Sequence, residues 1–252
     1  ALTTGARIQS VLTLRHKHFR IDTNPDSSVP LAIGRGTSVD SKYSKKQVLI
    51  IPSFIQKRLA TYSYSERSRN RFEKYCESRN IQASDEAMGE CYLFLSNRGH
   101  PFYDSKSDLF KREQSQERTN LRTGDSVRKF IKHHIFPIME KAFGEQYHFE
   151  FHDLRATFGM NLVDACKILV DKSEMKASEV VPFVQSRMNH SNSKTTENYI
   201  HYRERNKQAE EVIERYQNSL LDRINAVLER SQSTQTTSSD TVTNDVRSGN
   251  AN

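Results

Sequence analysis

His152-Asp153-Leu154-Arg155 and, farther along, His190-Ser191-Asn192-Ser193-Lys194-Thr195-Thr196-Glu197-Asn198-Tyr199 are the most informative stretches of this chain. The first places a histidine and an arginine three positions apart, and on a helix this spacing puts both side chains on the same side. The second places a histidine nine residues before a tyrosine. Together they supply several cationic groups and one phenol, which is a set suited to chemistry on a phosphodiester.

The types of these residues match the demands of that chemistry. A phenol has a pKa of about 10 and is a weak nucleophile at neutral pH, so cations must stabilise the reaction of a negatively charged phosphodiester. Guanidinium groups bind nonbridging oxygens bidentately and keep their charge at any physiological pH. A histidine exchanges protons near neutrality, and a lysine can protonate the departing 5′ oxygen. This chemistry requires no metal or other cofactor, and we expect none.

The ordered set resembles the signature of the tyrosine recombinases, the phage-integrase family. His-x-x-Arg is followed by a second histidine nine residues before a tyrosine, and the text from Met188-Asn189-His190-Ser191 to Tyr199-Ile200-His201 is similar to that family's Gly-His-Ser…Thr-Thr…Tyr-x-His box. Asn189 stands where glycine is usual. The resemblance implies that Tyr199 is the nucleophile, that Arg155 and His190 hold the phosphate, and that His152 assists proton movement.

Two further residues of the family pattern lie upstream. Thr4-Gly5-Ala6-Arg7 has the form of the segment that carries the family's first arginine, so the resemblance assigns that role to Arg7. The family's lysine lies in a β-hairpin before a strand that ends in proline, and Ser41-Lys42 best matches it. Lys42 lies farther from Pro52 than is typical, so Lys45 remains a rival for the general acid. An acidic residue is common three places after the first arginine, and this chain has Ser10 there.

The resemblance also implies a fold and a domain organisation. It covers residues 1–205 and predicts an α+β, mainly α, tyrosine-recombinase-like catalytic domain with a small antiparallel β-sheet or hairpin. We expect a C-terminal helix over 206–230, with a possible subunit contact, and a disordered tail over 231–252 that is rich in serine and threonine. The first residues read as the middle of a helix, so we expect a fragment without the upstream core-binding domain.

Apolar periodicity and turn residues place the motifs on elements. Helices are predicted over 1–18, 125–143, 152–170, 180–188 and 203–230, with Pro52 at the start of another and Pro137 kinking or ending the second. Strands are predicted over 31–33 and 48–51, as a hairpin with Lys42 near its tip, and over 92–95; residues 104–123 are predicted to be a loop or a partly ordered excursion. Thr195 is expected to cap the tyrosine-bearing helix.

Composition sets limits on partners and location. The formal net charge is +7 and the pI is about 9.3, which favours polyanionic partners. The scattered Cys76, Cys91 and Cys166 argue against a disulfide framework and a structural zinc site. We find no apolar run of about 18 residues and no signal peptide, which predicts a protein without a membrane partner. The expected location is cytoplasmic and nucleoid-associated, in a bacterium or phage.

The function implied by the resemblance is site-specific recombination or integration of double-stranded DNA through a 3′-phosphotyrosyl intermediate. The expected assembly is a homotetramer on DNA, with possible accessory DNA-bending proteins. Two alternatives stay open: a type IB topoisomerase, which shares the chemistry but rejoins the same strand, and a non-catalytic DNA-binding regulator that retains the fold. Single motifs are weak here, since a lone His-x-x-Arg is more often a surface pair, and Tyr202 lies only three residues from Tyr199.

Overall fold

The computed structural model describes residues 1–19, 27–114 and 120–239, except the side chains of 111–114, 199, 203–204, 206–207, 224 and 226–239. The chain divides into two units, residues 1–199 and 200–252. Helices predominate, and the described strands form one two-stranded antiparallel sheet. The predicted fold class, mainly α with a small antiparallel sheet, is confirmed.

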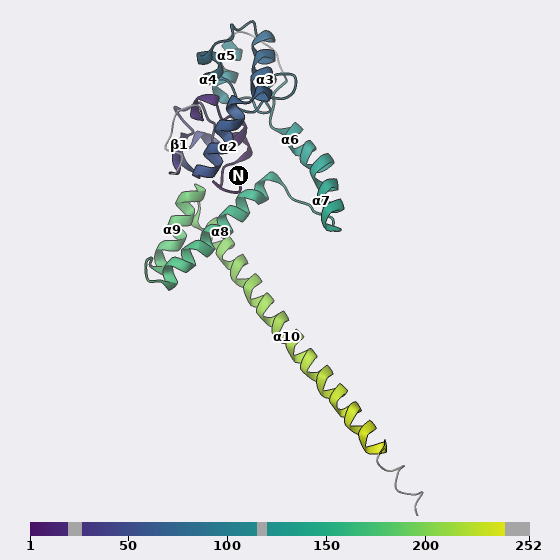
Figure 1. Ribbon diagram of the computed structural model, residues 1–252. Helices are drawn as coiled ribbons and strands as arrows, with labels where there is room; N and C mark the ends of the chain where they lie inside the picture. Colours follow the sequence, from purple (N-terminus) through teal and green to yellow (C-terminus); the bar gives the residue numbers. More distant parts are fainter. Residues whose placement is uncertain (20–26, 115–119, 240–252) are drawn as a thin grey trace, which may run out of the picture. The chain divides into compact units, whose positions relative to one another are not determined.

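The predicted hairpin is present (Figure 1). Strand β1 (Val29–Ile33) pairs with β2 (Gln47–Ile51), with Leu31 opposite Leu49. The strands alternate between buried and more exposed positions, as expected of a sheet with one covered face. The short 3-10 helix η2 (Lys42–Ser44) lies in the connection between them. Val39 of this connection is buried in the same apolar cluster as the strand residues Ile33 and Leu49, whereas Lys42 is exposed.

Helices α2 (Ser53–Tyr64), α3 (Glu66–Glu77) and α4 (Asp85–Glu90) follow the hairpin. Pro52 directly precedes α2, where a missing N–H costs nothing, as predicted. Two apolar clusters hold these elements together. One joins the N-terminal segment to the hairpin and consists of Ala6, Leu14, Phe19, Ile33, Val39, Leu49, Ile51 and Leu93. The other surrounds α3 and consists of Phe72, Tyr75, Cys76, Met88, Cys91, Tyr92 and Leu95.

The prediction of one helix over 1–18 is wrong. The segment contains only α1 (Ile8–Leu12) and the 3-10 helix η1 (His16–His18). Gly5 has a φ of 65°, which ends any helical run there, and a Cβ at this position would lie 2.6 Å from the Phe158 ring. Long-range packing thus overrides local helical propensity.

Two other predictions also need correction. Residues 92–95 form no regular strand, since only isolated bridges pair Arg15 with Tyr92 and Leu95 with Pro101. The predicted loop over 104–123 contains α5 (Lys106–Gln114), and its residues 115–119 lie outside the described part. Ser105 caps this helix by accepting a hydrogen bond from the backbone N–H of Asp108 at 3.3 Å.

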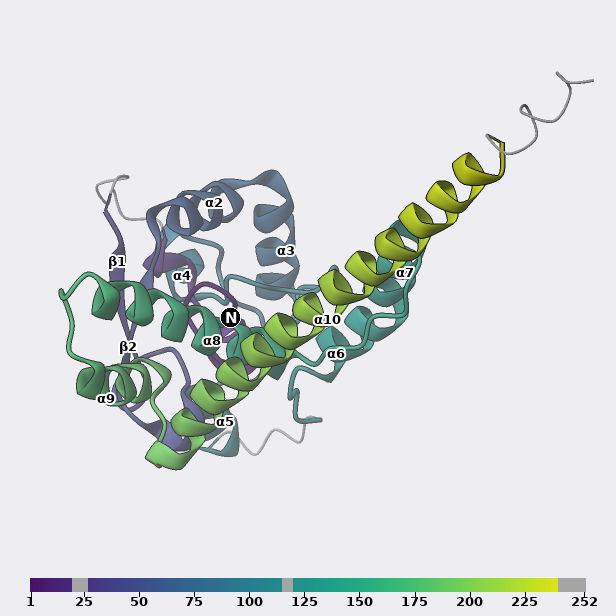
Figure 2. The ribbon, with the colours of Figure 1, turned by 90° about the horizontal axis from the view of Figure 1, so that it is seen from below.

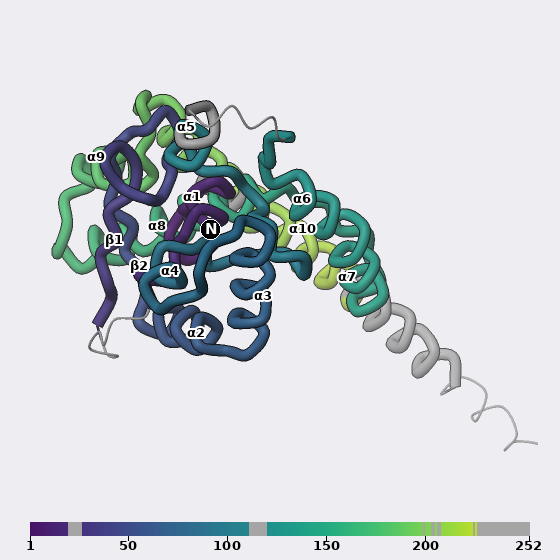
Figure 3. Tube along the Cα trace, turned by 90° about the horizontal axis from the view of Figure 1, so that it is seen from above, coloured from purple at the N-terminus to yellow at the C-terminus, as the bar shows by residue number. Residues whose placement is uncertain are grey.

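The predicted helix over 125–143 is confirmed, and proline shapes its middle. Helix α6 (Asp125–Phe130) continues through a π-helical turn, η3 (Ile131–Ile135), into α7 (Phe136–Phe143). Pro137 lies in the first turn of α7, where it has no N–H to donate to the preceding turn, and the wider π turn accommodates it. The three segments follow one continuous path in Figure 3.

Helices α8 (Phe151–Asp171) and α9 (Ala177–Met188) contain the two predicted helices in this region and lie side by side (Figures 1 and 2). Helix α10 begins at Ser193 and runs to Ser239, past the expected end at residue 230, and residues 240–252 lie outside the described part. The predicted cap at Thr195 is wrong: Asn192 accepts a hydrogen bond from the backbone N–H of Lys194 at 2.9 Å.

Candidate active site

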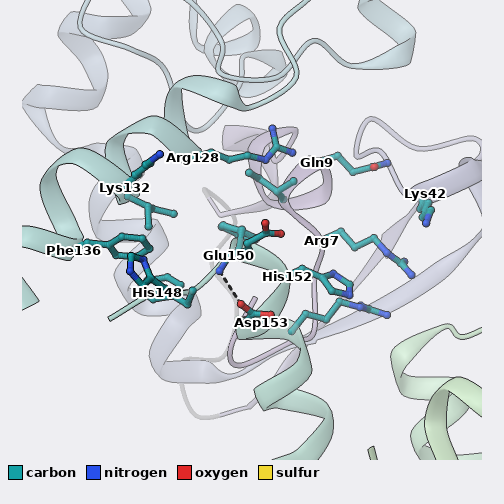
Figure 4. Close-up of a pocket in the computed structure, with 15 residues that line it drawn as sticks. Arg7, Gln9, Lys42, Arg128, Lys132, Phe136, His148, Glu150, His152 and Asp153 are labelled. Atoms are coloured by element: carbon teal, nitrogen blue, oxygen red, sulfur yellow. Dashed lines mark hydrogen bonds between the residues drawn. The ribbon is translucent and has the colours of Figure 1, made fainter. Parts of the chain in front are cut away.

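Four of the six predicted site residues line one pocket of about 650 Å³: Arg7, Lys42, His152 and Arg155. Arg7 and Lys42 are far in sequence from His152 and Arg155, and the fold brings them to the start of α8. Figure 4 shows Arg7 and His152 close together, with Lys42 at the same end of the pocket. The structure thus gathers the cations that the family resemblance had selected.

Local structure places His152 in the first turn of α8. The backbone N–H of Glu150 donates to Asp153 Oδ2 at 2.8 Å, which fixes the start of the helix, and Figure 4 marks this bond. Arg7 directly precedes the short helix α1, with an extended backbone. Because helix N-termini carry partial positive charge, the start of α8 favours an anion in this part of the pocket.

Arg155 connects the segments that carry two other site residues. Its side chain is 1% exposed, and its two terminal nitrogens donate hydrogen bonds to the carbonyl oxygens of Gly5 and Met188. Gly5 lies two residues before Arg7, and Met188 lies two residues before His190. One guanidinium group therefore ties both of those chain segments to α8, in addition to lining the pocket.

His190 is held at a sharp turn after α9. Its backbone N–H donates to the Gln185 carbonyl at 3.1 Å, and its Nδ1 lies 3.0 Å from Thr196 Oγ1. Asn189, which stands in place of the family's usual glycine, has a φ of 48°. Asparagine is one of the few residues that adopts this left-handed conformation readily, so the departure does not disturb the turn.

The cations act on one another electrostatically. The pKa of His190 is lowered to about 4, first by burial and then by the positive charges of Arg155, Arg7 and His152. The pKa of His152 is also lowered, by partial loss of solvation, by Arg155, by Arg7 and by Lys42, while Asp153 opposes the shift. Both imidazoles are therefore neutral at pH 7, in a region of positive potential.

The two candidate lysines occupy different places. Lys42 is exposed, lines the pocket and has its Nζ 5.1 Å from the centroid of the Tyr43 ring. Lys45 does not line the pocket, and its Nζ donates a hydrogen bond to Ser191 Oγ, next to His190. The geometry therefore favours Lys42 over Lys45 as the group that reaches a phosphate in the pocket.

Contacts to other elements hold the connection that carries Lys42. The backbone N–H of Asp40 donates to Thr13 Oγ1 at 2.9 Å, and the Asp40 carboxylate accepts from the backbone N–H of Lys106 at 2.9 Å. These bonds fasten the hairpin connection to the segment after α1 and to the start of α5.

Tyr199 belongs to α10, and its side chain lies outside the described residues. The prediction that it is the nucleophile therefore stays a prediction. The turn that precedes it is described: Thr196 is fully buried and contacts His190.

The pocket has lining residues that the sequence reasoning did not select. They are mainly on the α6–η3–α7 segment and the stretch before α8: Arg128, Ile131, Lys132, Phe136, His148, Phe149, Glu150 and Phe151. The spacing of Arg128, Lys132 and Phe136 by four residues was the available signal, because it puts all three on one helix face.

Among the described residues, no group of three or more histidine, cysteine or acidic side chains has an arrangement that would hold a metal ion. Within the same residues, no helix has both the length and the apolar content of a bilayer span. Cys76, Cys91 and Cys166 are buried free thiols.

The chain was compared with known proteins. No family model matches it, and no significant similarity to a curated protein was found. Among solved structures, it is similar to the Tn1549 transposon integrase in complex with a circular intermediate DNA, with 17% identity, a TM-score of 0.41 and coverage of 79% of this chain and 51% of that one. It is also similar to XerA recombinase, with 19% identity, a TM-score of 0.40 and coverage of 82% and 54%. The chain thus spans about half the length of these solved chains.

Proposed function

We propose that this chain carries the catalytic domain of a tyrosine recombinase, a site-specific DNA recombinase or integrase. The observation that supports this most strongly is the gathering of Arg7, Lys42, His152 and Arg155 around one pocket. His190, whose pKa is lowered in part by Arg155 and Arg7, is within the electrostatic influence of the same cluster. A cluster of like charges is unfavourable unless an anion binds to it, and a phosphodiester has the required charge and oxygen geometry.

In the proposed reaction, Tyr199 Oη attacks the phosphorus and the bond to the 5′ oxygen breaks. The protein is then joined to the 3′ phosphate, and the 5′ strand is released as a hydroxyl. His152, whose lowered pKa keeps it neutral, takes part in moving the phenolic proton. Lys42 donates a proton to the departing oxygen. Attack of a 5′ hydroxyl from a partner duplex reverses these steps and rejoins the strands without a nucleotide cofactor.

Arg7, Arg155 and His190 are proposed to hold the nonbridging oxygens. Arg155 does this as part of the pocket wall while its other contacts keep Arg7 and His190 in place. Assembly as a tetramer on DNA, the help of DNA-bending proteins and a nucleoid location in a bacterium or phage are parts of the same proposal.

The experiment is to trap the covalent adduct on a pool of nicked suicide duplexes of randomised sequence. Wild-type protein is expected to form an adduct that resists denaturation, Tyr199→Phe none, and the matched control Tyr202→Phe a normal amount. Absence of adduct from wild-type protein, together with normal DNA binding, would favour the non-catalytic regulator.

A second assay separates the recombinase from a topoisomerase. Supercoiled plasmid and a pair of linear duplexes that carry the sequence selected as adduct are incubated with the protein. Exchange of strands between the two duplexes supports the recombinase, whereas relaxation of the plasmid without exchange supports a type IB topoisomerase.

A further inference from the structure

The pocket extends beyond the catalytic cations into a region that the proposed chemistry does not use. We define this aromatic arm by Arg128, Lys132, Phe136, His148 and Phe149, all of which line the pocket. In Figure 4, Lys132, Phe136 and His148 lie at one end, while Arg7, His152 and Lys42 lie at the other. Glu150 and Asp153 lie between the two groups.

The rings of the aromatic arm contact one another edge to face. The Phe136 ring centroid lies 5.5 Å from that of His148, at an interplanar angle of 88°, and 5.2 Å from that of Phe149, at 65°. The half-buried Phe136 and Phe149 are therefore oriented by each other. Such a corner of rings offers a flat ligand both a face for stacking and an edge contact.

Two cations lie on the same helix face as Phe136. Arg128 donates to Asp125 Oδ1 at 2.7 Å and to the Thr123 carbonyl at 3.1 Å, so its charge is partly compensated. Lys132 is exposed, and within the described part of the chain its side-chain ammonium forms no hydrogen bond or ion pair. The arm thus combines an apolar aromatic wall with a cation that is available to a ligand.

A nucleotide matches this combination, because it joins a phosphate to a flat aromatic base through a short sugar. We propose that the aromatic arm binds the unstacked base of a nucleotide whose phosphate lies on the Arg7–His152–Arg155 end of the pocket. A volume of about 650 Å³ is within the range of pockets that enclose a ligand of this size. Base stacking on protein rings is the usual means of holding an extruded or single-stranded base.

This inference rests on the proposed function of the phosphate end, and it adds the neighbouring base as part of the substrate. The nucleotide has two possible sources, a DNA strand next to the cleaved phosphate or a free nucleotide. Both sources have the same phosphate, sugar and base, and the test below distinguishes them.

The test measures binding of short oligonucleotides to the full 252-residue chain. The probe is the trinucleotide thymidine–2-aminopurine–thymidine, whose fluorescence is quenched when the base stacks on a ring. Its affinity is compared with those of the same trinucleotide with an abasic central sugar and of free dAMP. We expect quenching on binding, and about tenfold weaker binding of the abasic form, as expected for loss of one stacked base.

Variants assign the binding to the aromatic arm. Phe136→Leu keeps an apolar side chain but removes the ring, and we expect it to abolish the difference between the base-bearing and abasic trinucleotides. Phe143→Leu is the matched control, because Phe143 is an exposed ring on the same helix that does not line the pocket. Lys132→Gln should weaken both trinucleotides, whereas Lys129→Gln, at an exposed position outside the pocket, should weaken neither.

Each outcome of these binding measurements either supports or contradicts the base subsite. Equal affinity for base-bearing and abasic trinucleotides, or no effect of Phe136→Leu, would overturn the base subsite even if the Tyr199 adduct forms. Equal, Phe136-dependent affinity for dAMP and the trinucleotide would support the subsite and assign it to free nucleotides. Because these measurements need no cleavage, base-dependent binding without any adduct would count against the proposed function but not against the subsite.

Discussion

Arg15 and Arg155 are both buried arginines, with exposures of 4% and 1%, but they have different surroundings. Arg15 forms a 3.2 Å ion pair with Asp108, donates to Ser105 Oγ at 2.9 Å and lies 3.7 Å from the centroid of the Tyr92 ring. Arg155 donates to two backbone carbonyls, and its charge lowers the pKa values of both His152 and His190. A carboxylate compensates the first arginine, whereas the second contributes to a shared positive potential.

This difference shows how a structural arginine is told apart from one at an anion site. Burying a charge is costly, and Asp108 offsets that cost for Arg15 within the protein. Around Arg155, the positive charges of Arg7 and Lys42 add to the same field, as the lowered pKa of His152 shows. A bound phosphate would relieve this repulsion, which supports the proposal that the phosphate chemistry takes place at Arg155 and not at Arg15.

The largest expected effect is that of Arg155→Ala on cleavage. We expect a loss of about 10³-fold, as for removal of a transition-state donor. Nonspecific DNA affinity should change little, since it is the sum of many phosphate contacts. Adduct yield and fluorescence anisotropy at several salt concentrations measure the two quantities. Equal losses of cleavage and binding would contradict the assignment.

Arg15→Ala is expected to lower the stability of the fold and to leave cleavage intact. Removal of Arg15 leaves the Asp108 carboxylate buried without its ion pair, so the free energy of unfolding should fall by about 3–5 kcal/mol. Adduct yield per folded molecule should stay normal. The control is Lys17→Ala, which breaks the exposed 2.8 Å pair with Glu90 and should cost less than about 1 kcal/mol. Urea unfolding measures both, and similar values for the two variants would remove the distinction between buried and exposed pairs.

Gly5→Ala tests the close packing against Phe158 of the segment whose carbonyl accepts a hydrogen bond from Arg155. Gly5 has a φ of 65°, and an added Cβ would meet the Phe158 ring at 2.6 Å, so we expect a loss of about 2–4 kcal/mol in unfolding free energy. Gly36→Ala is the matched control, because Gly36 has a φ of 83° and no atom within 4 Å of the added Cβ. It should cost only about 1 kcal/mol. Equal costs in thermal unfolding would show that packing against Phe158 is unimportant.

The smallest expected effect is on the pH dependence of stability. The pKa of His190 is about 4 in the folded protein and near 6.5 when unfolded, so the unfolded chain binds the proton more tightly. Stability attributable to His190 is complete above pH 6.5 and is lost as the pH falls toward 4. His190→Gln should therefore show a shallower loss than wild type between pH 6.5 and 4.5 in urea unfolding. Parallel curves for the two proteins would contradict the lowered pKa.

The sequence predicted those features that have local signals. Two short β-branched runs on either side of a polar, glycine-containing connection indicated the hairpin, and apolar periodicity indicated α8 with His152 and Arg155 on it. The order of motifs selected Arg7 and Lys42, which the fold brings into the same pocket as that pair.

Other features depend on contacts between distant residues. The end of the helical run at Gly5 depends on Phe158, and the pairing of Arg15 with Asp108 joins residues 93 positions apart, so neither has a local signature. The aromatic arm was missed for a similar reason. The spacing of Arg128, Lys132 and Phe136 marks one helix face, but the contact between the rings of Phe136 and His148 exists only in the fold.

The most direct measurement is mass spectrometry of the protein–DNA adduct after digestion by nuclease and protease. The peptide that contains both Tyr199 and Tyr202 is fragmented to locate the attached nucleotide. The account predicts a 3′-linked nucleotide on the oxygen of Tyr199, and predicts that Arg155→Ala protein yields almost none of it. A nucleotide on Tyr202 would contradict the assignment of Tyr199 as nucleophile, and an adduct that forms equally well without Arg155 would contradict its role in cleavage.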